Sequence, residues 1–262
     1  MSEYTKANEN AWDVASGFHQ DAMMEKWITG FESEGHTVFS EFEKDVYSKI
    51  SFKDKSIFHA PCNNGRELLS LLNMGARQGL GIDISGENIK VAQKLHKVSG
   101  GSAEFIHGDI YDVSNKISEK YDLGLVTVGS LNWMENLKEY FSAIKSNLVG
   151  NGELILLEMH PVAYVFPYTF NKNHEVKLDL PYFSKAPIVS TGSLDYYGNV
   201  EYESPKMYEF QHTISDIIKA LILLDFTIID FVEYPIDLAG GHGYLEKKGM
   251  VPLSFFLRAK LK

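Results

Sequence analysis

The chain has 262 residues, 44% of them hydrophobic and 23% charged. This composition allows a substantial buried core and excludes an intrinsically disordered protein. Its formal net charge of -10 would repel nucleic-acid phosphates and anionic lipids, so we expect no nucleic acid and no membrane as partners. The single cysteine, Cys62, excludes an intrachain disulfide and a multi-cysteine metal site. With a polar N-terminus that lacks an apolar signal-type segment, these features predict a cytoplasmic protein.

The first 50 residues have the pattern of helices. Large apolar side chains recur among polar ones over residues 5–50, which predicts two or three helices. The expected anchors of these helices are all aromatic: Trp12, Phe18, Trp27, Phe39 and Phe42. We expect residues 1–50 to form a helical lid on a larger domain over residues 51–262, the two making one structural unit.

Short apolar runs alternate with helical patterns between residues 56 and 158, which is typical of βαβ units that build a parallel sheet. Strands are predicted at residues 56–60, 79–84, 103–106, 121–128 and 152–158. Helices are predicted at residues 65–75, 86–97 and 136–148. Most of the strand segments are continuous apolar runs, as expected for strands that helices cover on both faces.

The C-terminal part departs from this alternation. Thr213 and Asp216 form a capping-box pattern ahead of the apolar run "IIKALILL", which predicts a helix there. Two strand-like runs follow at residues 226–234 and 251–261, and the glycine-rich segment between them is too short for a crossover helix. We expect these two strands to pair antiparallel and to complete a sheet of seven.

Residues 160–212 form an unusually long connection between the fifth strand and the capped helix. Eleven aromatic residues lie in this insertion, a content that fits either a lid with its own small core or the lining of a substrate pocket. The stretch "STGSLDYYGNVEYES" predicts a hairpin that turns near Tyr197, Gly198 and Asn199.

The turn after the first strand, "APCNNGRE", contains one glycine, Gly65. A dinucleotide fingerprint needs three spaced glycines and a phosphate loop needs a Gly-Lys-Ser/Thr ending, and neither is present. An acid, Glu67, follows just inside the predicted helix and disfavours a diphosphate. The turn therefore suits a zwitterionic or cationic ligand.

Acidic residues follow the next two predicted strands. In an open parallel sheet the ligand site lies at the carboxyl ends of the strands, beside the first strand. Asp83 is placed to accept the ribose hydroxyls of a nucleoside, and Asp109 to accept from an adenine amine, with Ile84 and Ile110 on the faces of the base. Either acid alone is also explained as a helix cap, so it is their joint placement that predicts a nucleoside site.

These segments together resemble the class I S-adenosylmethionine-dependent methyltransferases over residues 52–160 and the closing hairpin. The resemblance is carried by "IFHAPCNNGRELLSLLNMGA", "GLGIDIS", "AEFIHGDIYDV" and "YDLGLVTVGSLNWMENLKEYFSAIKSNLVGNGELILLEMHPV". More specifically, the chain is similar to a group of bacterial small-molecule methyltransferases. The residues that carry this similarity are Asn10, Trp12, Asp13, Ala15, His19, His59, Cys62, Glu158, His160 and Pro161.

The resemblance implies a Rossmann-like α/β fold with three layers, a seven-stranded, mostly parallel sheet, an N-terminal helical lid and an aromatic-rich lid inserted after the fifth strand. It implies S-adenosylmethionine as the methyl donor and S-adenosylhomocysteine as product. The expected donor-binding residues are Ala60, Pro61, Cys62, Asn63, Gly65, Asp83, Ile84, Gly108, Asp109, Ile110, Val128 and Trp12. The expected residues around the methyl acceptor are Gly129, Ser130, Asn132, Trp133, His19, Tyr164 and Tyr168.

The predicted activity is methyl transfer to O or N of a small aromatic or heteroaromatic acceptor, by a monomer or a homodimer. His160 is the candidate general base, although it also fits a role in holding the turn before Pro161. No metal site is expected, because the nine histidines lack the paired spacing of metal ligands. Two alternatives remain: a regulatory module that binds the donor without transfer, and a nicotinamide-dependent oxidoreductase.

Overall fold

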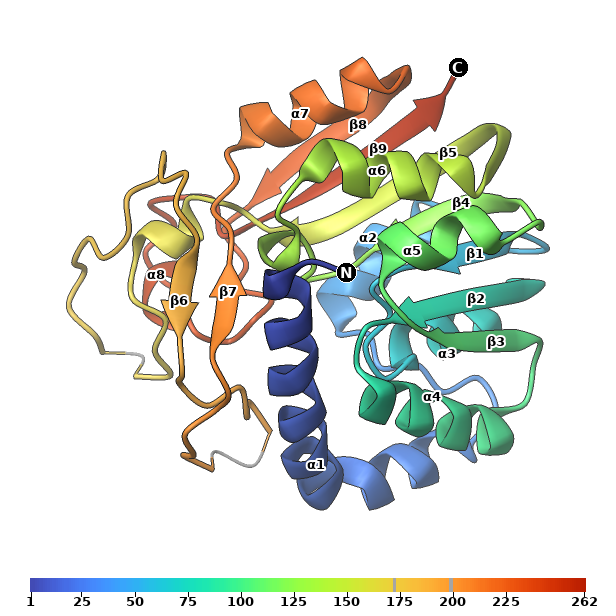
Figure 1. The fold of residues 1–262 in the computed structure, drawn as a ribbon, viewed down its shortest axis with the longest axis horizontal. Helices are drawn as coiled ribbons and strands as arrows, with labels where there is room; N and C mark the ends of the chain where they lie inside the picture. The colour runs from blue at the N-terminus through green and yellow to red at the C-terminus, as the bar shows by residue number, and fades with distance from the viewer. Residues whose placement is uncertain (172, 198–199) are drawn as a thin grey trace.

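The computed structural model describes residues 1–171, 173–197 and 200–262. Its centre is a seven-stranded sheet with the order β3-β2-β1-β4-β5-β9-β8 (Figure 1). The strands of this sheet are β1 Ser56–His59, β2 Gln78–Asp83, β3 Ala103–His107, β4 Tyr121–Val126, β5 Leu148–Met159, β8 Phe226–Tyr234 and β9 Ser254–Leu261. The first five are parallel, whereas β9 runs antiparallel to both β5 and β8. The predicted fold class is confirmed.

Helices cover both faces of the sheet, which gives three layers (Figure 1). One face packs against α5 Ile110–Val113, α6 Leu137–Ser146 and α7 Ile214–Leu223. The other packs against α2 Glu41–Ser48, α3 Arg66–Asn73, α4 Gly86–Ser99 and the end of α1 Glu3–Phe31. Each face has its own hydrophobic cluster, and this explains why β1 is buried at all four of its residues.

Two helices occupy the N-terminal region, as the sequence predicts. Trp27 and Phe31 at the end of α1 are buried in the same cluster as α2 and α3. The N-terminal part of α1 does not pack on the sheet. It lies between α4 and the insertion and contacts both α4 and β7 Met207–Glu209. The first helix therefore connects the core of the sheet to the inserted segment.

The insertion is mostly irregular, with a short ribbon of β6 Ile188–Ser190 paired antiparallel to β7. The sequence predicts a hairpin within residues 190–204, but the paired strands lie at the edges of that stretch and beyond it, joined by a long loop. Gly198 and Asn199, where the turn is predicted, lie outside the described residues. A short helical turn occurs in the insertion at Ala163–Val165, and another, α8 Gly243–Glu246, lies between β8 and β9.

The predicted cap of α7 is present. The Thr213 hydroxyl accepts from the Asp216 N–H at 3.1 Å, and the Asp216 carboxylate accepts from the Thr213 N–H at 3.0 Å. These two bonds satisfy amides that the helix cannot pair internally, so the local pattern alone fixes where α7 begins. In the described part of the chain, no helix is long and apolar enough to cross a bilayer.

Candidate active site

A large cavity of about 1310 Å³ lies at the carboxyl ends of the parallel strands. Its walls are the segments that follow β1, β2, β3 and β4, the first part of α1, and the insertion. In Figure 1, α1 and the β6–β7 ribbon stand at the same end of the sheet. Because β1 pairs with β2 on one side and β4 on the other, this is where the strand order reverses, the position at which open α/β sheets bind ligands.

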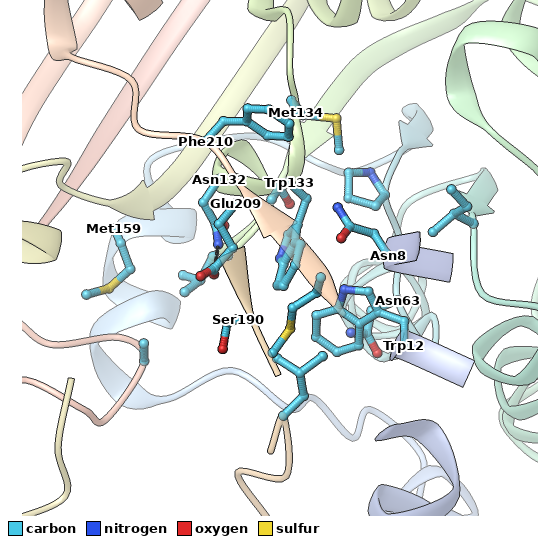
Figure 2. A pocket seen from close by; sticks show the side chains of 18 of the residues that line it. Asn8, Trp12, Asn63, Asn132, Trp133, Met134, Met159, Ser190, Glu209 and Phe210 are labelled. Atoms are coloured by element: carbon cyan, nitrogen blue, oxygen red, sulfur yellow. Dashed lines mark hydrogen bonds between the residues drawn. The ribbon is translucent and has the colours of Figure 1, made fainter. Parts of the chain in front are cut away.

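The cavity has two sides, which can be distinguished in Figure 2. Asn63, Trp12 and Asn8 lie on one side of the view, and Met159 and Glu209 on the other, with the ring of Trp133 between them. The first side adjoins the carboxyl ends of β1, β2 and β3, and we call it the sheet side. The second adjoins β5 and the insertion, and we call it the insertion side.

The turn after β1 contributes only some of its residues to the cavity. Pro61 and Asn63 line it, whereas Ala60, Cys62 and Gly65 lie behind them in the packed core. The Cys62 N–H donates to the Ile82 carbonyl at 2.8 Å, which ties the turn to the end of β2. Three of the five residues predicted in this turn therefore shape the loop without lining the cavity.

Gly65 has a structural reason to be glycine. Its φ is +74°, in the left-handed region, and an added Cβ would lie 2.6 Å from the Phe105 ring and 2.9 Å from the Ala92 Cβ. The absence of a side chain thus lets α3 begin directly against β3 and α4.

The substitution Gly65→Ala is expected to lower the free energy of unfolding by about 2 kcal/mol, because it adds backbone strain and overpacking. Urea denaturation measures the change. Gly17→Ala is the matched control, since an added Cβ there meets nothing within 4 Å on α1 and should stabilise the helix slightly. Equal stabilities of the Gly65→Ala variant and the parent would refute the packing argument.

Asp83 ends β2 and lines the cavity, with only 6% of its surface exposed. Its Oδ2 accepts from the Asn63 N–H at 2.7 Å and its Oδ1 from the Ser85 N–H at 2.9 Å. Burial raises the pKa of Asp83 to about 6, although hydrogen bonds from the Ser85 and Asn63 N–H groups and from the Asn88 side chain act in the opposite direction. The carboxylate is thus held rigidly, and it keeps acceptor capacity for a ligand hydroxyl.

Asp109 lies at the carboxyl end of β3 and lines the same cavity. Its Oδ1 accepts from the Tyr111 N–H at 3.0 Å, so it also caps α5. The cap and the ligand explanations are therefore both compatible with its position. Ile84, Gly108 and Ile110, which the sequence analysis placed in the donor site, line the cavity beside the two acids.

The loop after β4 is held by a buried acid, Glu158 of β5, which is 2% exposed. Its two oxygens accept from four backbone N–H groups: Gly129 at 2.6 Å, Ser130 at 2.7 Å, Leu131 at 3.0 Å and Met159 at 2.7 Å. Gly129 and Ser130 line the cavity, and Gly129 has a φ of +80° with open space where a Cβ would stand. Glu158 therefore positions this wall from behind without reaching the cavity.

The family model described as a methyltransferase domain matches residues 57–152, which include β1 to β4 and every strand end that forms the sheet side. Residues 57–152 form a methyltransferase domain of the class I S-adenosylmethionine-dependent type. No curated protein matches it.

Several solved structures share the fold of this methyltransferase. An S-adenosylmethionine-dependent methyltransferase from Mesorhizobium loti has 16% identity and a TM-score of 0.59, covering 82% of this chain and 95% of its own. One from Clostridium acetobutylicum has 16% identity and a TM-score of 0.57, covering 94% and 97%. The glycopeptide N-methyltransferase MtfA, solved with S-adenosylhomocysteine, has 12% identity and a TM-score of 0.56, covering 84% and 88%. At these identities the similarity bears on the fold alone.

The first helix of the methyltransferase presents one face to the cavity. Tyr4, Asn8 and Trp12 line it at helical spacing. The Asn8 side chain pairs with the backbone of Tyr208 in β7, donating to its carbonyl and accepting from its N–H, both at 2.8 Å. The ring of Trp12 meets that of Trp133 edge-on at 5.3 Å, so α1, the insertion and the loop after β4 are fastened together.

His160 does not line the cavity of the methyltransferase. Its Nδ1 accepts from the Val162 N–H at 3.1 Å, and its Nε2 lies 2.9 Å from the Glu233 carboxylate on β8. Burial lowers the pKa of His160, against the raising effect of Glu233. The imidazole thus fits the alternative prediction that it holds the turn after β5, and it has no part in the function proposed below.

His19 is also turned away from the cavity. It is buried between α1 and the insertion, where its Nε2 lies 3.1 Å from the Leu194 carbonyl. Burial lowers the pKa of His19, which keeps the ring neutral near pH 7, and Nε2 then donates to that carbonyl. Of the other residues predicted around the acceptor, Gly129, Ser130, Asn132, Trp133, Tyr164 and Tyr168 all line the cavity, as does Val128 from the donor set.

Neither Cys62 nor His59 forms a reactive pair. Burial raises the pKa of the Cys62 thiol well above its ordinary value, so it stays protonated. Burial lowers the pKa of His59 to about 3, and its Nε2 lies 3.2 Å from the Thr127 hydroxyl, within the core. Within the described ranges, no three His, Cys, Asp or Glu side chains are grouped to hold a metal ion.

Arg66 and Glu209 are among the charged residues that line the cavity and that were not predicted as site residues from the sequence. The guanidinium of Arg66 lies 4.6 Å from the centre of the Trp27 ring, donates to the Tyr197 hydroxyl, and donates through Nε to Asn64 at 2.8 Å. The available indication was a basic residue directly after the glycine of the first turn. Glu209 lies in the insertion, where no local pattern distinguishes it from the other acids.

Proposed function

We propose that this methyltransferase transfers the methyl group of S-adenosylmethionine to O or N of a small aromatic or heteroaromatic molecule. The observation that carries the proposal is that Asn63, Asp83 and Asp109 line one cavity from the ends of three neighbouring strands. Acids and an amide, flanked by isoleucines, match the hydroxyls, amine and faces of an adenosyl group.

The sheet side of the cavity accommodates the donor. Asp83 accepts from the ribose hydroxyls, Asp109 from the adenine amine, and Ile84 and Ile110 pack on the base. Arg66 is the only Lys or Arg among the described residues that line the cavity, and it provides the cation for the carboxylate of the methionine part. Bound S-adenosylmethionine supplies a methyl group on a positively charged sulfur.

The insertion side accommodates the acceptor. Trp133, Tyr164 and Phe210 offer flat apolar surface there, which suits an aromatic molecule, and Met159 adds a flexible apolar side chain to the same wall. We propose that residues 1–50 and the insertion act together as the lid, since Asn8 pairs with β7 across the mouth of the cavity.

The protein's contribution to the reaction is alignment. Methyl transfer is a displacement in line with the sulfur, and holding two reactants in that line supplies much of the rate. The loop after β4 is fixed by Glu158 between the two sides of the cavity, so it sets the approach of the acceptor. No protein nucleophile is required.

Calorimetry and label transfer test this proposal. S-adenosylhomocysteine is expected to bind the purified protein with one site, NADH is expected not to bind, and label from methyl-labelled S-adenosylmethionine is expected to reach a member of a panel of small phenols and amines. Binding of NADH without S-adenosylhomocysteine would support an oxidoreductase instead. Donor binding with no transfer across the panel would support the regulatory module.

A further inference from the structure

The insertion side of the cavity contains a fixed polar pair, Asn132 and Glu209. The Asn132 Nδ2 donates to the Glu209 Oε1 at 2.8 Å, and the Phe210 N–H donates to the Asn132 carbonyl at 2.7 Å. One side chain follows β4 and the other ends β7, so both bonds join the sheet to the insertion. Figure 2 shows their polar ends together, with Met159 on one side of the view and Trp133 on the other.

Most of the hydrogen-bonding capacity left in this pair is that of acceptors. These are the oxygens of the Glu209 carboxylate and the Asn132 Oδ1, beside one remaining N–H of the Asn132 amide. The Asn132 Oδ1 is buried and has no hydrogen-bond partner among the described residues. A buried polar atom without a partner costs about 1 to 3 kcal/mol, which a bound ligand recovers when it supplies a donor. The ligand that satisfies the pair must therefore carry N–H or O–H groups.

Charge narrows the choice of ligand. Met159 and Met207, which line the cavity near the pair, are almost fully buried, and burial raises the pKa of the Glu209 carboxyl. No ion pair of Glu209 is formed within the described part of the chain. A positively charged ligand would keep the Glu209 carboxylate ionised. It would supply the favourable interaction that the buried carboxylate has lost with water.

Acidic groups predominate around the cavity. Two positive groups line it, the guanidinium of Arg66 and the N-terminal ammonium of Met1, which pairs with Asp112. Ten carboxylate side chains line it as well: Glu43, Glu67, Asp83, Asp109, Glu135, Glu139, Asp179, Asp195, Glu201 and Glu209. Arg66 is engaged with Trp27 and Tyr197 on the sheet side. The negative field attracts a cationic acceptor and repels a carboxylic acid.

We propose that Glu209 and Asn132 form a subsite for the amino group of the acceptor, which selects small aromatic molecules that carry an alkylammonium group over alcohols and acids. The proposal rests on the proposed function, since it assigns the acceptor class of the same cavity. The carboxylate binds the ammonium and the Asn132 Oδ1 accepts a second N–H. Glu209 is thereby a specificity-determining residue contributed by the insertion.

The test uses three probes of one shape on the protein saturated with S-adenosylhomocysteine: benzylamine, benzyl alcohol and benzoate. Ligand-observed NMR measures their dissociation constants. Benzylamine is expected to bind at least about tenfold more tightly than the other two, because only it pairs with the carboxylate. Glu209→Gln is expected to remove this preference while leaving the affinity for S-adenosylhomocysteine unchanged.

Glu201→Gln is the matched control, because Glu201 also lines the cavity from the insertion but is exposed. It should retain the preference for benzylamine. Equal or tighter binding of benzoate to the unaltered protein, or no measurable binding of benzylamine, would overturn the subsite whether or not the variants fold. Failure of S-adenosylhomocysteine to bind would instead overturn the proposed function, which separates the two outcomes.

Discussion

Glu158→Ala is expected to lower the free energy of unfolding by about 3 to 5 kcal/mol, since it removes the acceptor for four backbone N–H groups in a dry environment. Each unsatisfied buried donor is costly, and the lost side chain also leaves a cavity. Urea denaturation followed by circular dichroism measures the change.

Glu153→Ala is the matched control on the same strand. Glu153 forms an ion pair with Arg258 at 2.7 Å in a partly exposed position, so its loss should cost less than about 1 kcal/mol. The stability of Glu158→Gln should fall between those of the two alanine variants. Glutamine keeps one acceptor oxygen, but its NH2 group would face backbone N–H groups that need an acceptor. If Glu158→Ala were as stable as Glu153→Ala, the loop after β4 would not depend on this carboxylate.

Asp83→Ala is expected to weaken the binding of S-adenosylhomocysteine by about 1 to 3 kcal/mol, which is roughly 5-fold to 150-fold in the dissociation constant. The substitution removes the proposed acceptor of the ribose hydroxyls and releases the N–H groups of Asn63 and Ser85. Calorimetry at pH 7.5 measures it. Glu87→Ala is the control, because Glu87 is more exposed on the next helix and pairs with Lys90. Unchanged affinity in Asp83→Ala would remove Asp83 from the ribose role.

The same carboxyl predicts how donor binding depends on pH. Its pKa in the free protein is raised to about 6 by burial, and the ionised form is the one that accepts two hydroxyls. Affinity should therefore be nearly full from about one pH unit above this pKa and should fall as the pH drops through it, by up to about tenfold per pH unit. Asp83→Asn should abolish this dependence. A dissociation constant of the parent protein that is level between about pH 5 and 7.5 would contradict the assignment.

Local patterns predicted the elements whose ends form the sheet side of the cavity. Continuous apolar runs marked β1, β2 and β4 because these strands are covered on both faces, and the Thr213–Asp216 box marked the start of α7. The same logic placed Asp83 and Asp109 at strand ends, and parallel pairing then brings such ends to one edge. For these two acids, knowing that they follow a strand is enough to place them at the cavity, because parallel strands all end at the same edge of the sheet.

The insertion gave no such guide. Its aromatic content predicted a lid or a pocket, but β6 and β7 are three residues each, too short for a periodic pattern, and the predicted hairpin was misplaced. Glu209 becomes recognisable as a site residue only through its hydrogen bond with Asn132, which is 77 positions away in the chain. His160 shows the converse error, since its place beside β5 was predicted but its side chain points to Glu233 on β8.

The sequence by itself determined the parallel core, the antiparallel close of the sheet and the strand-end acids, because each follows from hydrogen bonding and burial within a few residues of chain. Tertiary structure alone decided which side chains share the cavity. Whether Arg66, Glu158, His160 or Glu209 faces a ligand, a loop or another strand depends on contacts between segments distant in sequence, which form only when those segments pack against one another.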